Sequence, residues 1–371
     1  MPLAHCGWPF FAARSYRTIF VSSLAALALN INGYAQSVPQ GTDSIVDTAE
    51  RQKVIDGALG YLKIHYVYLD IAAKMDESIR AHCANGDYDK VADTRAFAEL
   101  LTAHLQEVSH DLHLRVVLDL NPNPEHPQDA GNSGHATEFE AARRDNFGFS
   151  VIQVLAGNVG YLDFNNFSAL PEAKETCIAA MNFLANTDAR IIDLRRNHGG
   201  STNLGDLLSS YLFDGSVHLY DVYFRDRDKS DSHFTTKEVR GRRFGASKPL
   251  FILTSRQTIS CAEGFADSLR GLKRATIVGE TTAGGAHTVG KWQIDERFSI
   301  WVPRGHVIIP GEKTDWEGTG IEPDIKTDFS LALKTAHLAA LDKLLEALPL
   351  GKRHDELARI HEVVAQYKVS K

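Results

Sequence analysis

A serine between a buried strand and a helix is the residue in this sequence with the clearest potential for chemistry. Ser260 follows the apolar, proline-bounded run 249–253 and precedes the helical spacing of 262–272. Free N–H groups and the helix dipole at such a junction favour a developing negative charge, so the position suits a nucleophile for acyl transfer. With Glu263, Ser260 also forms the S-x-x-E pattern of a capping box, in which the hydroxyl only satisfies backbone N–H groups.

A serine nucleophile needs a base within hydrogen-bond reach and a group that orients this base. The candidate base is His113, which closes a helical segment just before the apolar run 116–118. The candidate orienting carboxylate is Glu317, which precedes a glycine-rich turn. Both residues also have ordinary interpretations, because the chain has 16 histidines and a loop glutamate is usually solvated.

A glycine pair, Gly199–Gly200, follows the apolar strand expected at 190–194. Glycines allow a backbone to approach a substrate closely, and their N–H groups can join that of Cys261 in binding an oxyanion. The alternative is an ordinary glycine turn between a strand and a helix. No G-x-G-x-x-G pattern follows the strand, which argues against a dinucleotide site.

The elements that must position these residues follow from the apolar periodicity. Residues 44 to about 118 show a helical pattern, and 121–134 are rich in turn formers. A hairpin at 147–155 and 159–164 then opens an alternation of helices and strands that predicts an α/β core. The tail from 330 predicts two amphipathic helices, broken near 349–351. The predicted domains are therefore an N-terminal helical domain (44–120), an α/β core (135–329) and C-terminal helices (330–371).

The N-terminus predicts a secretory signal peptide over residues 1–35. Two arginines precede the apolar run 18–29, and small residues lead to an expected cleavage after Ala35. The run is shorter than the roughly 20 residues that span a bilayer, and no later segment is apolar enough to cross one. We therefore expect a secreted or periplasmic protein without an integral membrane span.

Composition and cysteine spacing exclude several classes of function. The net charge of −7, from 40 basic and 47 acidic residues, argues against nucleic-acid binding. Cleavage after Ala35 would leave three cysteines, whose spacing suits neither a disulfide framework nor a metal site. Of these, Cys261 is expected to fill core space, with a thiol nucleophile as the weaker alternative.

Together the segments resemble the S41 family of serine peptidases, the tail-specific and tricorn-type group that includes the interphotoreceptor retinoid-binding protein repeats. The resemblance covers about residues 110–327, in the family's order. Its carriers are Asp111–His113, Asp193–Gly200, Thr254–Glu263, Val278–His287 and Gly320–Ile325.

The family divides by its catalytic base. Its processing peptidases use a serine–lysine dyad, with the lysine in a turn resembling 282–286, where this chain has none. The nearest, Lys291, lies several residues later, and the chain has no room for a PDZ-like insertion. The resemblance therefore favours the tricorn-like branch and implies the set Ser260, His113 and Glu317. Leu112 departs from that branch, which has a serine immediately before its histidine.

The resemblance implies a crotonase- and ClpP-like α/β fold, a spiral of ββα units preceded by an N-terminal helical domain. It also implies a serine peptidase that cleaves a peptide or protein substrate through an acyl-enzyme on Ser260, without metal or other cofactor. Cys261 with Gly199 or Gly200 would bind the oxyanion, and His287 is a possible substrate-side residue. Two other functions stay open: binding of apolar ligands on the same fold and, less favoured, crotonase-type thioester chemistry. The oligomeric state stays open too.

Overall fold

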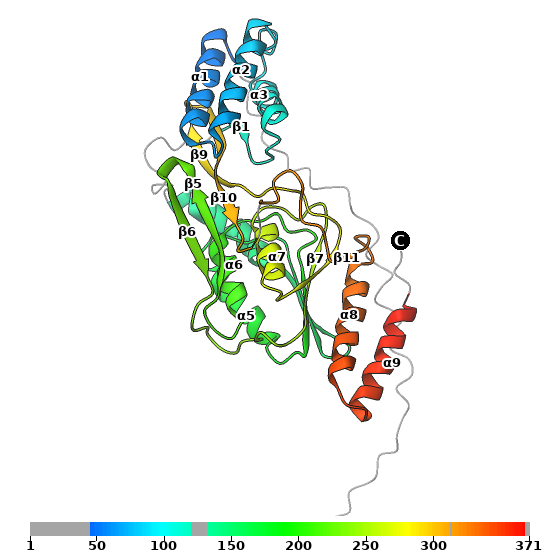
Figure 1. Cartoon of the computed structure of the whole chain (residues 1–371). Helices are drawn as coiled ribbons and strands as arrows, with labels where there is room; N and C mark the ends of the chain where they lie inside the picture. The colour runs from blue at the N-terminus through cyan, green and yellow to red at the C-terminus, as the bar shows by residue number, and fades with distance from the viewer. Residues whose placement is uncertain (1–44, 120–131, 312–313, 368–371) are drawn as a thin grey trace, which may run out of the picture. The chain divides into compact units, whose positions relative to one another are not determined.

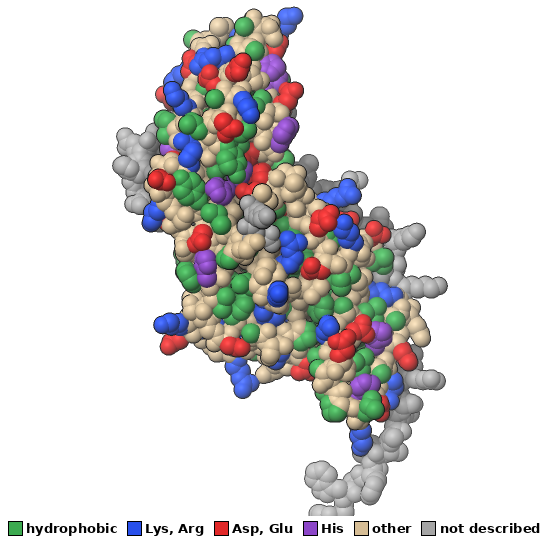
Figure 2. Space-filling model, viewed as in Figure 1, with side chains coloured by type: hydrophobic (Ala, Val, Ile, Leu, Met, Phe, Trp, Pro, Cys, Tyr) green, Lys and Arg blue, Asp and Glu red, His purple; other side chains and the backbone are tan. Residues whose placement is uncertain are grey.

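Three helices begin the described part of the chain: α1 (Thr48–His65), α2 (Leu69–Ala84) and α3 (Thr94–Ser109) (Figure 1). The computed structural model describes residues 45–119, 132–311 and 314–367, so the predicted signal peptide lies outside the described residues. Asp47 and Asp93 cap α1 and α3, each accepting a hydrogen bond from a backbone N–H of the first turn. Figure 2 shows charges of both signs interspersed over the visible face of these helices.

The helical pattern expected to run to about residue 118 ends earlier. His110, at the end of α3, adopts the left-handed conformation with φ 55°, which terminates the helix. The run Arg115–Leu118 then forms strand β1, which pairs antiparallel with β10 (Phe298–Ile308). The prediction of helix was wrong here because the partner strand lies far along the chain and local periodicity does not show it.

A five-stranded sheet carries the N-terminal helices. Its order is β1-β10-β5-β6, with β9 (Thr288–Gln293) also paired with β10; β5 and β6 span His218–Phe224 and Lys229–Phe234. The buried faces of α1, α2 and α3 pack in one apolar cluster with Phe298, Ile300 and Val302 of β10. The helical unit therefore completes its core with residues from the second half of the chain, and residues 45–371 form one compact unit.

The α/β core is built on a six-stranded sheet of order β11-β8-β7-β4-β3-β2. Its strands are β2 (Phe149–Leu155), β3 (Val159–Phe164), β4 (Ala189–Asp193), β7 (Leu250–Thr254), β8 (Thr276–Gly279) and β11 (Ile325–Lys326). The hairpin pair β2–β3 is antiparallel and all other pairs are parallel. The hairpin and the alternation of strands and helices are confirmed.

Helices cover both faces of this sheet, which explains why β4 and β7 are buried along their whole length. One apolar cluster joins the sheet to α5 (Ala173–Phe183), α6 (Thr202–Ser210) and α7 (Cys261–Gly271). A second joins its other face to α8 (Ala332–Ala347) and α9 (Lys352–Gln366), the two predicted C-terminal helices. Helix α4 (Asn132–Arg144) precedes β2, and no described helix is long and apolar enough to cross a membrane.

Candidate active site

Ser260 stands at the N-terminus of α7 in a conformation that a helix cap does not need. The capping box with Glu263 is formed, and the Ser260 N–H donates to the Glu263 carboxylate at 2.8 Å. N-cap residues ordinarily have extended backbones, whereas Ser260 has φ 62° and ψ −127°. Such a conformation costs a non-glycine residue on the order of 1–3 kcal/mol and is concentrated at functional sites. The cap is therefore real, and the backbone strain points to a second role.

Glu263 joins the nucleophile turn to the segment 282–285. Its side chain is fully buried and accepts hydrogen bonds from Ser260 N, Thr282 Oγ1, Gly284 N and Gly285 N at 2.5–2.9 Å. Burial raises the pKa of this carboxyl, and the four donors oppose that rise. The sequence indicated Glu263 only as a capping partner. In the structure it fixes the turn against which the candidate base packs.

His113 follows the end of α3, and its backbone N–H donates a hydrogen bond to Asp111 Oδ1 at 3.0 Å. Its ring packs directly on Gly285, since a Cβ at Gly285 would lie 2.7 Å from His113 Cε1 and 2.9 Å from Ile259 Cγ1. Burial lowers the pKa of His113, and the charge of Asp111 opposes this shift only in part. The imidazole is therefore neutral near pH 7, as a general base must be.

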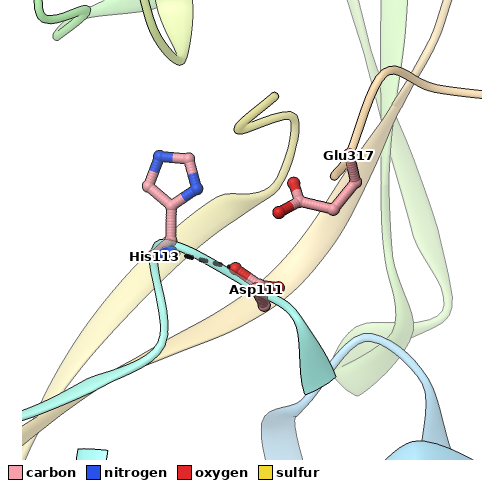
Figure 3. A group of neighbouring side chains, drawn as sticks. All are labelled: Asp111, His113 and Glu317. Carbon is pink, nitrogen blue, oxygen red and sulfur yellow. Dashed lines mark hydrogen bonds between the residues drawn. The ribbon is translucent and has the colours of Figure 1, made fainter. Parts of the chain in front are cut away.

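Glu317 lies beside His113 with one carboxylate oxygen uncommitted. Asp111, His113 and Glu317 each place one side-chain atom within 4.8 Å of the others, and Figure 3 shows the Glu317 carboxylate facing a ring nitrogen of His113. Among the described residues, neither His113 Nδ1 nor Glu317 Oε1 has a hydrogen-bond partner, although both atoms are buried. Buried polar atoms are rarely left unpaired, so a small closure that joins these two is favoured.

Burial and the nearby charge of Asp111 raise the pKa of Glu317 to about 7, while the charge of His287 opposes that rise. A carboxyl with this pKa is about half ionised at neutral pH. Its ability to accept a bond from an imidazole therefore depends on pH in the physiological range.

Ser260 and His113 line the same cavity, of about 1080 Å³, together with Gly200 and Cys261. Gly199 lies just behind the nucleophile: it has φ +84°, and a Cβ there would come within 2.8 Å of Ser260 Cβ. Its N–H donates to Asn197 Oδ1 at 2.9 Å and is thus committed. Cys261, at the first position of α7, and Gly200 are the better placed of the predicted oxyanion donors.

His287 is buried within the site, although it also borders the cavity. Its Nδ1 lies 2.6 Å from Asp111 Oδ2 and 3.5 Å from Glu317 Oε2, and its Nε2 lies 3.6 Å from Asp315 Oδ2. Sequence reasoning assigned no role to Asp111 or Asp315. The D-x-H spacing before the candidate base was the one available signal for Asp111.

Three residues bear on questions that the sequence raised. Lys291, on β9, pairs with Asp119 at 2.5 Å, and its side chain is 42 % exposed. Burial raises the pKa of the Cys261 thiol far above neutrality, which disfavours a thiolate. Leu112, in the place of the branch's serine, is half exposed on the cavity wall.

Asp111, His113 and Glu317 are also, within the described ranges, the one group of ligand-type side chains close enough to share a metal ion. Asp111 already accepts from His113 N–H and holds the His287 ring. Burial alone would lower the pKa of His287, but its hydrogen bond to Asp111 and the other carboxylates nearby raise it to about 10, so His287 is a cation at neutral pH. A cation 3.5 Å from Glu317 would repel a divalent ion, so these residues fit a metal poorly.

Two family models match this chain. One is Peptidase family S41, over residues 158–327, and the other is the N-terminal domain of Peptidase_S41 in eukaryotic IRBP, over residues 42–151. A serine and a histidine on one cavity of an α/β fold, with a glutamate facing the histidine, agree with the class that these models define. The chain belongs to peptidase family S41.

Curated relatives include carboxyl-terminal-processing peptidase 1 of Arabidopsis thaliana chloroplasts, which is 27% identical over 172 residues, and a carboxyl-terminal-processing protease of Synechocystis, which is 29% identical over 170 residues. These matches cover 46% and 45% of this chain but only 33% and 37% of the relatives. The chain thus spans about a third of the length of the curated relatives it matches.

Solved structures share the fold at low sequence identity. A putative peptidase from Parabacteroides merdae superposes with a TM-score of 0.52 at 17% identity, covering 75% of this chain and 90% of that one. A lipoprotein from Streptococcus agalactiae gives 0.54 at 16% identity, covering 79% and 96%. The predicted fold, an S41 α/β core preceded by a helical region, is confirmed.

Proposed function

We propose that this chain is a secreted or periplasmic serine peptidase of the tail-specific or tricorn-like type, acting through an acyl-enzyme on Ser260. The observation that carries the proposal is the strained Ser260 on the same cavity as a neutral histidine, which faces the Glu317 carboxylate; His113 Nδ1 and Glu317 Oε1 are both unpaired. A serine that only capped α7 would need none of these features.

In the proposed reaction, His113 takes the proton of the Ser260 hydroxyl while Oγ attacks the scissile carbonyl carbon. The N–H groups of Cys261 and Gly200 hold the oxyanion, and Glu317 stabilises the imidazolium that forms. His113 then protonates the leaving amine, and water repeats the sequence to release the acyl group. Ser260, His113, Cys261 and Gly200 border the cavity, and Glu317 faces His113 (Figure 3).

A second function is favoured by the walls of the same cavity. Large apolar side chains line it, among them Phe167, Leu170, Leu219, Phe265 and Trp316. Such a surface suits an apolar substrate side chain, and it suits an apolar ligand that is bound and not cleaved. Reactivity of Ser260 separates the two functions.

The test is labelling with a fluorophosphonate, which reacts with an activated serine. We expect the wild type to be labelled, Ser260→Ala and His113→Ala to lose labelling, and Cys261→Ala and Lys291→Ala to keep it. A folded wild type that is not labelled would exclude the hydrolase and favour the binding protein. Loss of labelling in Lys291→Ala but not in His113→Ala would show that the base is the lysine.

Two further experiments complete the test. Incubation with EDTA should leave labelling unchanged, whereas loss that Zn²⁺ restores would show a metal-dependent site. Peptide cleavage should follow the same pattern of variants as labelling. Cleavage that persists in Ser260→Ala would show that another group performs the reaction.

A further inference from the structure

We propose that His287 is a positioning residue: a buried cation, held by Asp111, that fixes the Glu317 carboxylate toward His113. The inference deepens the proposed function and rests on it for its kinetic consequences. Sequence reasoning offered His287 as a possible substrate-side residue, whereas its contacts within the site assign it to the machinery behind the base.

The geometry places three carboxylates around one imidazole. The His287 side chain is only 2 % exposed, and Asp111, Glu317 and Asp315 lie 2.6, 3.5 and 3.6 Å from its ring nitrogens. Buried carboxylates this close repel one another and are costly without a positive partner. In the described part of the site, His287 lies among them and supplies that charge.

The turn that carries His287 also determines which oxygen of Glu317 remains available. Glu317 Oε2 accepts from Ala286 N–H at 2.5 Å and from His287 N–H at 3.2 Å, on the same side as the His287 ring. Oε1 is left unpaired, as is Nδ1 of His113, the residue that the Glu317 carboxylate faces (Figure 3). The backbone and the ring of His287 therefore both lie against Oε2, and Oε1 is left available to His113.

The charge of His287 acts on both partners in the same direction. It lowers the pKa of His113, which favours the neutral base, and it opposes the rise in the pKa of Glu317, which favours the ionised carboxylate. Removing this charge would raise both pKa values. As the pH falls, His113 would then become protonated, and Glu317 neutral, at a higher pH than in the wild type.

Other titratable groups face His287 from β10 and from the start of α2. Burial lowers the pKa of His306 on β10, and burial with nearby acidic charges raises the pKa of Tyr68 to about 12. Tyr68 packs its ring on His287 at 5.5 Å, and Tyr66 donates to Asp111 at 3.4 Å. Burial likewise raises the pKa of Tyr66, so His306, Tyr68 and Tyr66 are neutral near pH 7. Among these four groups His287 is therefore the charged one, and Arg115 is the other cation whose charge lowers the pKa of His113.

The decisive variant is His287→Gln, which removes the charge but keeps a hydrogen-bond donor. The measurement is the rate constant of fluorophosphonate labelling as a function of pH. We expect the acid limb to move by about one unit or more to higher pH, because a charge within about 4–6 Å shifts a pKa by about 1–3 units. His306→Gln, a matched change on a neighbouring neutral histidine, should leave the limb unchanged.

An unchanged acid limb in folded His287→Gln would overturn the proposal, even if the rate fell at every pH, because lower rates alone indicate a structural role. His287→Lys, which retains a cation, should bring the limb back toward the wild-type position. Absence of wild-type labelling would refute the proposed function instead of this inference.

A second measurement does not depend on the folding of a variant. Imidazole ¹⁵N NMR of the wild type should show His287 doubly protonated from pH 6 to pH 9. A His287 ring that loses its proton near its ordinary pKa would overturn the proposal.

Discussion

Gly285→Ala tests whether His113 is the base. It should displace the His113 ring without replacing any residue of the proposed catalytic set. The new Cβ would lie 2.7 Å from His113 Cε1, whereas carbon atoms in contact are about 3.5–4.0 Å apart. Gly285 does not have the left-handed φ that would strain an alanine. The side chains must therefore yield, and the imidazole has to move by about 1 Å.

A displacement of about 1 Å at a catalytic group costs about 10²-fold in rate, or about 2.7 kcal/mol of transition-state stabilisation. The assay is the rate constant of fluorophosphonate labelling, accompanied by urea unfolding. Since the new methyl would also lie 2.9 Å from Ile259 Cγ1, we expect a loss of about 1–3 kcal/mol in the free energy of unfolding from overpacking.

Gly60→Ala is the matched control, because Gly60 lies inside α1 and no atom is within 4 Å of its added Cβ. It should raise the free energy of unfolding by about 0.5–1 kcal/mol and leave labelling unchanged. The reasoning is refuted if folded Gly285→Ala is labelled at the wild-type rate, since a displaced ring could not then be the base.

Three other predictions follow from charges and hydrogen bonds in the site. The labelling rate of the wild type should fall as the pH drops through about 7, because the raised pKa of Glu317 leaves this carboxyl protonated at lower pH. Glu317→Gln should be labelled slowly and should show no acid limb near pH 7. A wild-type acid limb below pH 5 would contradict this. Between about pH 6.5 and 10, the free energy of unfolding should fall with rising pH more steeply in the wild type than in His287→Gln, by about 1.4 kcal/mol per pH unit. The reason is that the folded state holds a proton on His287 over this range, whereas the unfolded chain has released it. Parallel urea-derived curves for the two proteins would contradict the raised pKa of His287. Glu263→Gln should lower the free energy of unfolding by about 3–5 kcal/mol, because an amide NH₂ would then face buried donors. The surface change Glu140→Gln should alter this free energy by no more than about 0.5 kcal/mol. Equal urea midpoints for the two variants would show that Glu263 does not tie the two turns together.

The elements missed by sequence reasoning are those that depend on distant partners. Strand β10 contains Pro303, which argues locally against a strand, but a register shift between Pro303 and Gly305 accommodates it. Strand β1 lies where the local pattern predicts the end of a helical segment, and its partner β10 is far along the chain. Strand pairing of this kind depends on the whole chain, so local periodicity could not reveal it.

The roles of Asp111, Asp315 and His287 were hidden for a related reason. A histidine next to one carboxylate is common on a surface, and only burial makes its charge state decisive. Here the three carboxylates come from the end of the helical region and from the loop after β10, and they surround a ring from the turn before β9. Their sequence spacing gives no measure of these distances.

Four features can be predicted from local sequence alone: the apolar run that becomes β7, the capping pattern at α7, the glycine pair after β4 and the alternation that defines an α/β core. Those features depend on neighbouring residues, whose periodicity and backbone preferences are written in order along the chain. Tertiary contacts place His113 on Gly285, tie this turn to Ser260 through Glu263, and bury His287 among three carboxylates. Contact and burial join segments far apart in the sequence, and they set both the geometry and the charge of the site.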